Sequence, residues 1–153
     1  MSVTSIRSVD DLNRYLESTD APEFVYFWGH RPKGAKVDES CLSQWFPSKF
    51  KVGRNVFLTA EHFMMYRKAE VFGDHAAADR VLSAGDPRQA KAVGRQVQNF
   101  DAGTWDEFRW EIVVAGNVAK FSQNLGLGEF LLGTGNAILV EASPVDAIWG
   151  IGL

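Results

Sequence analysis

The sequence has very little cysteine: Cys41 is the one residue of this type among 153. An internal disulfide framework is therefore excluded, and this usage fits a reducing compartment. No apolar run approaches the ~18 residues that a membrane-spanning helix needs. The first residues, MSVTSIRSVDDLNRYLE, lack the apolar core of a secretory signal. These absences predict a cytoplasmic protein that makes no contact with a membrane.

Metal-binding and nucleotide-binding patterns are missing as well. His30, His62 and His75 have no ligand spacing, so the sequence predicts neither a metal site nor another cofactor. Three short Gly-x-Gly pieces occur, but none completes a dinucleotide fingerprint or a phosphate loop. The formal net charge of −3 offers no overall field for wrapping duplex nucleic acid, although a local basic patch could still hold a phosphate.

The composition is that of an ordinary globular domain, apart from its aromatic residues. Hydrophobic residues make up 46% and charged residues 23% of the chain, and 153 residues suit one domain with one core. Aromatic residues reach 12%, with five Trp, eleven Phe and three Tyr. Most of these must be core, and a surplus can line a pocket for a flat heterocycle.

Capping signals and apolar periodicity predict that helices dominate. Asp86-Pro87 is a strong helix start, and Thr104 to Glu107 reads as a capping box for the longest helix. A first helix is predicted to begin at Ser8. Five further helices are predicted over residues 59–72, 76–84, 86–97, 104–124 and 128–132.

Short apolar runs predict a small β-sheet beside these helices. The expected strands cover residues 23–28, 55–58 and 137–142, and residues 29–51 are expected to be irregular. The chain is therefore predicted to be a single α+β domain over residues 1–153, mainly helical with a small β-sheet.

Two carboxyl groups are candidates for chemistry. Glu61 lies in the first turn of a predicted helix, where the helix dipole and free N–H groups favour an ionised carboxylate at neutral pH. Lys68 lies two turns further on the same face. Asp146 lies in a turn before Trp149, and with Glu61 it forms a possible pair for glycosidic bond hydrolysis. By position alone, each carboxylate is more commonly a helix-stabilising or turn-stabilising group.

Trp105 lies in the first turn of the longest predicted helix, where helix formation does not require a large aromatic residue. It is either the edge of the core or a platform on which a base could stack.

Taken in chain order, several segments resemble the NADAR (YbiA-like) family. The resemblance covers nearly the whole chain from Phe24 onward, and its specificity comes from the order of the segments. The segments are FVYFWGH (24–30), SQWFPSKFKV (43–52), TAEHFMMYRKA (59–69), DPRQAKAVGRQV (86–97), TWDEFRWEIVVAGNVAKFSQN (104–124) and LLGTGNAILVEASPVDAIWGIG (131–152).

The resemblance implies an N-glycosidase, a hydrolase that cleaves the bond between ribose and a nitrogen base. The YbiA-like branch acts on phosphoribosylamino-pyrimidine intermediates of riboflavin biosynthesis. Other branches are proposed to process NAD or ADP-ribose derivatives, including ADP-ribosylated guanine. The expected partner is thus a small ribosyl or ADP-ribosyl substrate, or an ADP-ribosylated nucleic acid, with no stable protein partner.

By its motifs, the resemblance assigns the catalytic positions to Glu61 and Asp146, and leaves open which of them takes which role. The residues expected to bind the substrate are Trp105, Lys68, Arg95, Trp149 and Trp45. Family chains usually continue past the WGxG segment into a terminal helix, so an element of this kind is expected to be missing or shortened here. The alternative function is a non-catalytic module that binds ADP-ribose or a nucleotide through the same pocket.

Overall fold

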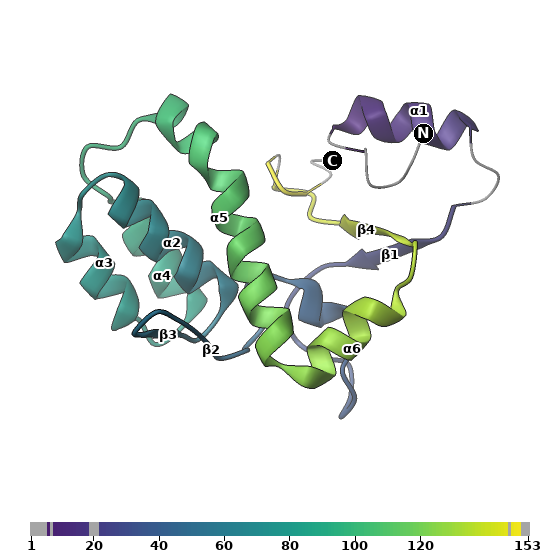
Figure 1. The fold of residues 1–153 in the computed structure, drawn as a ribbon, viewed down its shortest axis with the longest axis horizontal. Coiled ribbons are helices and arrows are strands. Elements are labelled where there is room, and N and C mark those ends of the chain that lie inside the picture. Colours follow the sequence, from purple (N-terminus) through teal and green to yellow (C-terminus); the bar gives the residue numbers. More distant parts are fainter. Residues whose placement is uncertain (1–5, 7, 19–21, 147, 151–153) are drawn as a thin grey trace.

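The computed structural model describes residues 6, 8–18, 22–146 and 148–150 of the chain. Its helices and strands follow one another along the sequence as Figure 1 shows. In chain order they are α1 (Val9–Ser18), β1 (Phe24–Phe27), the short 3₁₀ helix η2 (Glu39–Leu42), β2 (Phe50–Val52), β3 (Asn55–Phe57), α2 (Ala60–Val71), α3 (His75–Leu82), α4 (Pro87–Gly94), α5 (Ala102–Gln123), α6 (Leu125–Gly133) and β4 (Ile138–Glu141).

Helix α5 lies between two parts of the molecule. The helices α2, α3 and α4 gather on one side of it, and α6 with the strands β1 and β4 lies on the other (Figure 1). The mainly helical α+β class predicted from the sequence is confirmed. Among the described residues, none of the helices combines the length and the apolar character needed to cross a bilayer.

The predicted start signals of α2 and α4 are confirmed by their hydrogen bonds. Thr59 Oγ1 accepts from the backbone N–H of His62 at 3.3 Å, and Asp86 Oδ1 accepts from that of Gln89 at 2.8 Å. Pro87 occupies the first turn of α4, where its missing N–H costs no hydrogen bond. The ends of these elements shift by a few residues, since α4 stops at Gly94 and not at Val97.

The start of α5 was placed wrongly by the sequence. Its N-cap is Asp101, whose Oδ1 accepts from the backbone N–H of Thr104 at 2.8 Å and from the hydroxyl of that residue at 2.7 Å. Thr104 therefore lies inside the helix, and it is the residue that the cap holds. Two capping residues stand three positions apart here, and the earlier one begins the helix.

The buried face of α5 is not a continuous apolar stripe. The buried residues of this helix are Ile112, Gly116 and Lys120, while Phe108 is 45% exposed. The reason is a close approach to α2: a Cβ atom at Gly116 would lie 2.7 Å from the ring of Phe63. A small residue is needed where the two helices cross, so apolar periodicity cannot identify that face.

Two separate pairs of strands replace the expected single sheet. The strands β1 and β4 pair in parallel with Phe24 opposite Ile138, and β2 and β3 form an antiparallel hairpin with Phe50 opposite Phe57. Strand β2 begins at Phe50, at the end of the segment 29–51 that was expected to be irregular. Its three residues are too few to show an alternating pattern.

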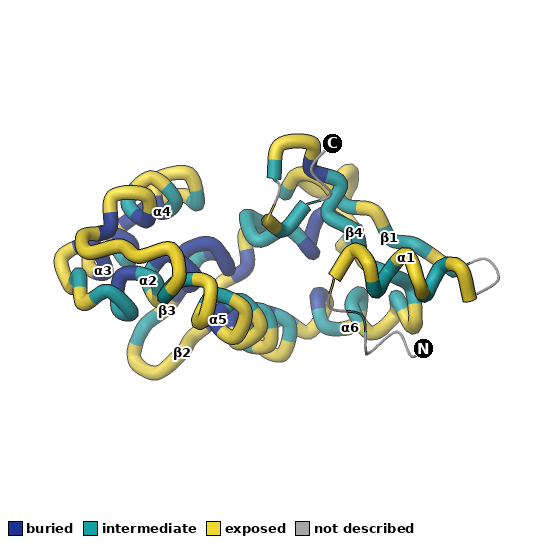
Figure 2. The backbone as a smooth tube through the Cα atoms, turned by 90° about the horizontal axis from the view of Figure 1, so that it is seen from above, coloured by how far each residue is buried: buried dark blue, intermediate teal, exposed yellow. Residues whose placement is uncertain are grey.

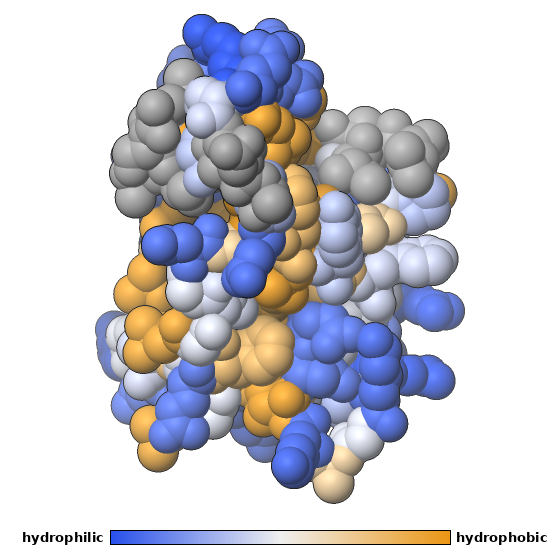
Figure 3. Space-filling model, turned by 90° about the vertical axis from the view of Figure 1, so that its right-hand side faces the viewer, coloured by the Kyte–Doolittle hydropathy of each residue, from blue (hydrophilic) through white to orange (hydrophobic). Residues whose placement is uncertain are grey.

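The main core lies where α2, α3, α4 and α5 meet the β2–β3 hairpin, and it appears as the buried part of the backbone in Figure 2. Its buried residues are Phe50, Phe57, Phe63, Met64, Met65, Val81, Ala84, Ala90 and Ile112. On the side of the molecule that carries α1, β1, β4 and α6, hydrophobic residues are visible at the surface (Figure 3).

Candidate active site

A pocket of about 230 Å³ lies where α2, α4 and α5 meet β4 and the C-terminal loop. All seven residues that the sequence analysis singled out line it, although they come from distant parts of the chain. Its lining is Ser43, Gln44, Trp45, Glu61, Met64, Met65, Lys68, Lys91, Gly94, Arg95, Trp105, Glu141, Asp146, Ile148 and Trp149.

Glu61 is the most deeply buried charged side chain of this lining, with 3% of its surface exposed. It lies in the first turn of α2, and its backbone N–H donates to the carbonyl of Gln44 at 3.0 Å. Within the described residues, Glu61 Oε1 is the buried side-chain oxygen that has no hydrogen-bond partner. Buried polar atoms are nearly always satisfied, so this oxygen is available to a ligand.

The pKa of Glu61 contradicts the expected ionised carboxylate. Burial raises this pKa from 4.5 to about 7, although the ammonium of Lys91 and the side chain of Trp45 lower it. The nearby carboxyls of Asp146 and Glu141 raise it further. A helix N-terminus stabilises a first-turn carboxylate by roughly 1 kcal/mol when water surrounds it, and here desolvation outweighs that effect.

Asp146 has the opposite character. Burial acts to raise its pKa, but its contacts with backbone N–H groups and with Lys91 lower the pKa below the usual value. Its Oδ1 accepts from the N–H groups of Ile148 and Trp149, each at 2.9 Å. These bonds also fix the turn that brings Trp149 to the pocket.

Lys91 and Glu141 are site residues that the sequence analysis missed. Lys91 lowers the pKa of all three carboxyls in the pocket, and burial followed by Asp146 raises the pKa of Glu141. Both residues carried a signal in the sequence. Lys91 stands four residues before Arg95 and thus on one helix face, and Glu141 ends an apolar strand where a charge is unusual.

Lys68 and Trp105 are neighbours in the lining of the pocket. Lys68 Nζ donates to the carbonyl of Gly94 at 2.9 Å and lies 4.2 Å from the ring centre of Phe100 and 5.8 Å from that of Trp105. Burial lowers the pKa of Lys68, and the carboxyl of Glu61 opposes this effect. Trp105 is half-buried and also packs against the main core.

The other two tryptophans flank the carboxyl groups. Lys91 Nζ lies 5.7 Å from the ring centre of Trp45. Trp149 stacks on Trp110 with ring centres 6.5 Å apart, and Arg109 lies 5.7 Å from the centre of the Trp149 ring. Flat rings therefore stand next to cations on two sides of the pocket.

His62, the neighbour of Glu61, has a structural role. Its Nε2 bonds the carbonyl of Ala84 at 3.1 Å, and its Nδ1 bonds Thr59 Oγ1 at 2.8 Å. A carbonyl only accepts, so Nε2 carries the proton; burial lowers the pKa of the ring. Among the described residues, no group of three or more His, Cys, Asp or Glu is arranged to hold a metal ion.

An apolar hollow of about 510 Å³ adjoins this pocket between α5, α6 and β4. The two share Gln44, Met64, Glu141 and Trp149. The remaining lining of the hollow is almost entirely hydrophobic, and it includes Trp110, Val114 and Phe121.

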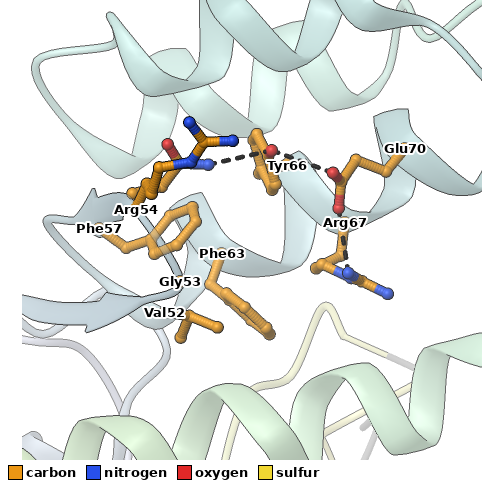
Figure 4. A pocket seen from close by; sticks show the side chains of 9 residues that line it. Val52, Gly53, Arg54, Phe57, Phe63, Tyr66, Arg67 and Glu70 are labelled. Carbon is orange, nitrogen blue, oxygen red and sulfur yellow. Dashed lines mark hydrogen bonds and ion pairs between the residues drawn. The ribbon is translucent and has the colours of Figure 1, made fainter.

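A larger pocket of about 600 Å³ lies on the opposite side of α2, and Figure 4 shows it. Its polar groups bond one another: Asn55 donates to Tyr66 Oη at 3.0 Å, which donates to Glu70 at 3.0 Å, and Arg67 pairs with Glu70 at 3.0 Å. It contains none of the residues singled out from the sequence. We therefore take the smaller pocket around Glu61 as the candidate site.

The smaller pocket combines chemical abilities that suit an anionic, flat ligand. Glu61 can give or take a proton near neutral pH, while Asp146 holds a negative charge. Three cations can neutralise phosphate, and three tryptophan rings can stack on a heterocycle.

The sequence is similar to those of known proteins. The chain is 41% identical over 139 residues to N-glycosidase R617 of Acanthamoeba polyphaga mimivirus, which covers 88% of this chain and 81% of that protein. It is 33% identical over 111 residues to the riboflavin biosynthesis protein VVA0006 of Vibrio vulnificus (strain YJ016), covering 72% of this chain and 29% of that protein.

The fold matches a solved structure as well. The NMR structure of the E. coli protein YbiA superposes with a TM-score of 0.70 at 24% identity, covering 86% of this chain and 74% of that one. At that identity the match shows a shared fold. The model of the NADAR domain family matches residues 26–153 of the chain. With that match and the similarity to R617, the chain belongs to the NADAR domain family.

Proposed function

We propose that the chain hydrolyses the N-glycosidic bond between a phosphorylated ribose and a nitrogen base, with Glu61 and Asp146 as its catalytic residues. The broader class, an N-glycosidase, follows from its relatives in the NADAR domain family. The proposed substrates are phosphoribosyl or ADP-ribosyl compounds. A relative named for riboflavin biosynthesis supports the phosphoribosyl choice.

One observation carries this proposal: two carboxyl groups in one pocket have pKa values that move apart. Glu61 is raised to about 7 and Asp146 is lowered. Such a divergence is how glycosidases obtain a proton donor and an anion from the same residue type.

In the proposed reaction, Glu61 gives its proton to the departing nitrogen while the bond from C1′ to that nitrogen breaks. Positive charge then builds on C1′ and the ring oxygen, and the Asp146 carboxylate stabilises it. Water adds to C1′, and its proton passes to the ionised Glu61. The products are free base and ribosyl phosphate, with Glu61 restored to its starting form.

The substrate is held by the rest of the lining. Lys68 and Arg95, which were expected to bind the substrate, neutralise its phosphate, and Lys91 adds a third cation. Trp105, with Trp45 or Trp149, stacks on the base.

The deciding experiment incubates the purified chain with a ribosylamino-pyrimidine phosphate and, separately, with an ADP-ribosylated guanine nucleotide. Chromatography then measures the free base. We expect release from at least one substrate. Binding of both without any release would replace the enzyme with the alternative, a module that only binds nucleotides.

Glu61→Gln is expected to abolish turnover without unfolding the protein. The amide is nearly isosteric but cannot transfer a proton, and loss of acid–base catalysis lowers kcat by roughly 100-fold or more. The measurement is kcat with the released base, together with circular dichroism.

Glu70→Gln is the matched control, because Glu70 lies on the same helix and lines the opposite pocket. It should keep wild-type kcat. A Glu61→Gln protein with most of its kcat would remove Glu61 from the chemistry.

A further inference from the structure

Lys120 is a buried lysine that the proposed chemistry does not use. Its side chain has no exposed surface, and its Nζ donates to the carbonyls of Cys41 at 2.6 Å and Ser43 at 2.8 Å. The rings of Phe121 and Phe46 lie 4.9 and 5.9 Å from the ammonium. None of the ion pairs among the described residues involves it. The two carbonyls therefore replace water around the cation.

A second side chain of α5 holds the same segment. Asn117 exchanges two hydrogen bonds with the side chain of Gln44, at 3.1 and 3.2 Å, and its own amide also donates to the carbonyl of Val113 at 2.9 Å. Asn117 and Lys120 stand three residues apart and so project from one face of the helix. Residues 41–45 are thus tied to α5 at three residues, Cys41, Ser43 and Gln44.

The tied segment forms the wall next to Glu61. The carbonyl of Gln44 accepts from the Glu61 N–H at 3.0 Å, and the Trp45 side chain contacts the Glu61 carboxyl closely enough to lower its pKa. Both Gln44 and Trp45 line the candidate site. Whatever loosens residues 41–45 from α5 therefore admits water beside that carboxyl.

We propose that Lys120 and Asn117 are positioning residues of the candidate active site, which clamp residues 41–45 onto α5 and thereby keep the Glu61 carboxyl out of water. The benefit of this clamp to catalysis rests on the proposed function. The clamp itself concerns the state of Glu61 and needs no substrate.

The surroundings of Glu61 and Lys120 make the pKa of Glu61 a measure of the clamp. Burial is the largest influence on the pKa of the Glu61 carboxyl, and the groups that act on it are Lys91, Trp45, Asp146 and Glu141, together with Lys68, whose own pKa responds to Glu61. Lys120 faces the Cys41 thiol, and burial lowers its own pKa to about 8. Releasing the clamp hydrates Glu61, so the pKa of Glu61 must fall toward its usual value.

The test is a ¹³C NMR titration of the glutamate carboxyl groups in the intact chain. The Glu61 signal is the one missing from the Glu61→Gln spectrum. We expect the pKa of this signal to fall by about one unit or more in Lys120→Met and to fall in Asn117→Ala as well. Lys49→Met is the matched control, since it removes an exposed lysine charge and should leave the titration unchanged.

A role limited to stability gives a different result. It lowers the melting temperature of Lys120→Met while the Glu61 titration stays in place, and that outcome overturns the proposal. If Lys120→Met does not fold, the titration of Glu61 in Asn117→Ala is the deciding measurement, since Asn117 is only half-buried. An unmoved titration in Asn117→Ala overturns the clamp. Because no substrate is involved, an absent N-glycosidase activity would leave this result standing.

Discussion

Glu61 and Asp146 are identical in chemistry apart from one methylene group, yet one pocket shifts their pKa values in opposite directions. Asp146 receives two backbone N–H groups, which are fixed dipoles directed at a negative charge. Glu61 Oε1 receives none. Burial acts to raise both pKa values, and the backbone donors that Asp146 meets outweigh it there, whereas Glu61 Oε1 has no donor to do so.

The raised pKa of Glu61 predicts a pH-dependent stability difference. Between its usual pKa of 4.5 and about 7, the folded state binds more protons than the unfolded state, so Glu61 lowers the free energy of unfolding as pH rises. We expect Glu61→Gln and the wild type to be similarly stable at the lower limit. Above pH ~7 the variant should be more stable, by at most about 3 kcal/mol.

Thermal unfolding at both ends of this range measures that difference. The pKa of Glu141 is also raised, but Glu141 is present in both proteins and cancels in the comparison. A melting-temperature difference that does not change with pH would mean that Glu61 is hydrated in the folded protein.

Sequence reasoning found Glu61, Asp146, Lys68 and Arg95, but it could not assign their protonation. The sequence shows that Glu61 lies in the first turn of a helix, and the helix dipole there favours an ionised carboxylate. Part of the burial that reverses this comes from Gln44 and Trp45, which reach Glu61 from outside its helix. Local rules therefore identify a residue type and place, while its pKa belongs to its tertiary surroundings.

The capping of α5 changes the interpretation of Trp105. With Asp101 as the N-cap, Trp105 lies a full turn into the helix, and its side chain reaches both the pocket and the main core. It was expected to be either a core residue or a stacking platform. The structure shows that the ring packs against the core and lines the pocket, and its stacking on a base stays a prediction.

Trp105→Ala is expected to lower both stability and activity. Catalysis should weaken by ~10-fold or more if a base stacks on the ring, since such stacking is worth roughly 1–3 kcal/mol. The half-buried ring predicts a loss of roughly 2 kcal/mol of stability, below the cost for a fully buried Trp. Melting temperature and kcat/KM should be measured on the same samples.

Trp105→Phe separates the two contributions, because it retains a ring face and much of the packing. It should keep a good part of the activity. Normal turnover in Trp105→Ala below its melting temperature would limit Trp105 to the core.

Two helix starts were predicted correctly from their capping residues, and elements that depend on a neighbouring element were missed. Thr59 and Asp86 identify two helix starts correctly. The strand β2 and the face of α5 with Gly116 and Lys120 were missed. Both depend on the partner element, since β2 exists through its pairing with β3, and Gly116 matters because α2 crosses there.

The whole site is assembled from both sides of α5. The helices α2 and α4 supply Glu61 and the cations, while β4 and the loop after it supply Glu141 and Asp146. No spacing in the sequence relates these two groups. The resemblance to the NADAR family pointed to Glu61 and Asp146 together, and Glu141 was found from the structure.

Activity is expected to survive EDTA. Within the described residues the carboxyls and histidines form no set of three that could hold a metal ion, and the proposed steps use protein groups and water. Turnover should be measured before and after chelation and gel filtration. Loss on chelation with recovery on adding Zn²⁺ or Mn²⁺ would contradict this. Mg²⁺ on a substrate diphosphate is a separate effect, tested with the monophosphate substrate.

Helix α2 has a pocket on each of two faces and the core between them. Of its twelve residues, Arg67 is the one with an exposed side chain. A segment surrounded in this way has almost no position that is free to vary. Replacing each residue of the chain in turn would therefore find α2 the least permissive stretch, and Arg67 the exception within it.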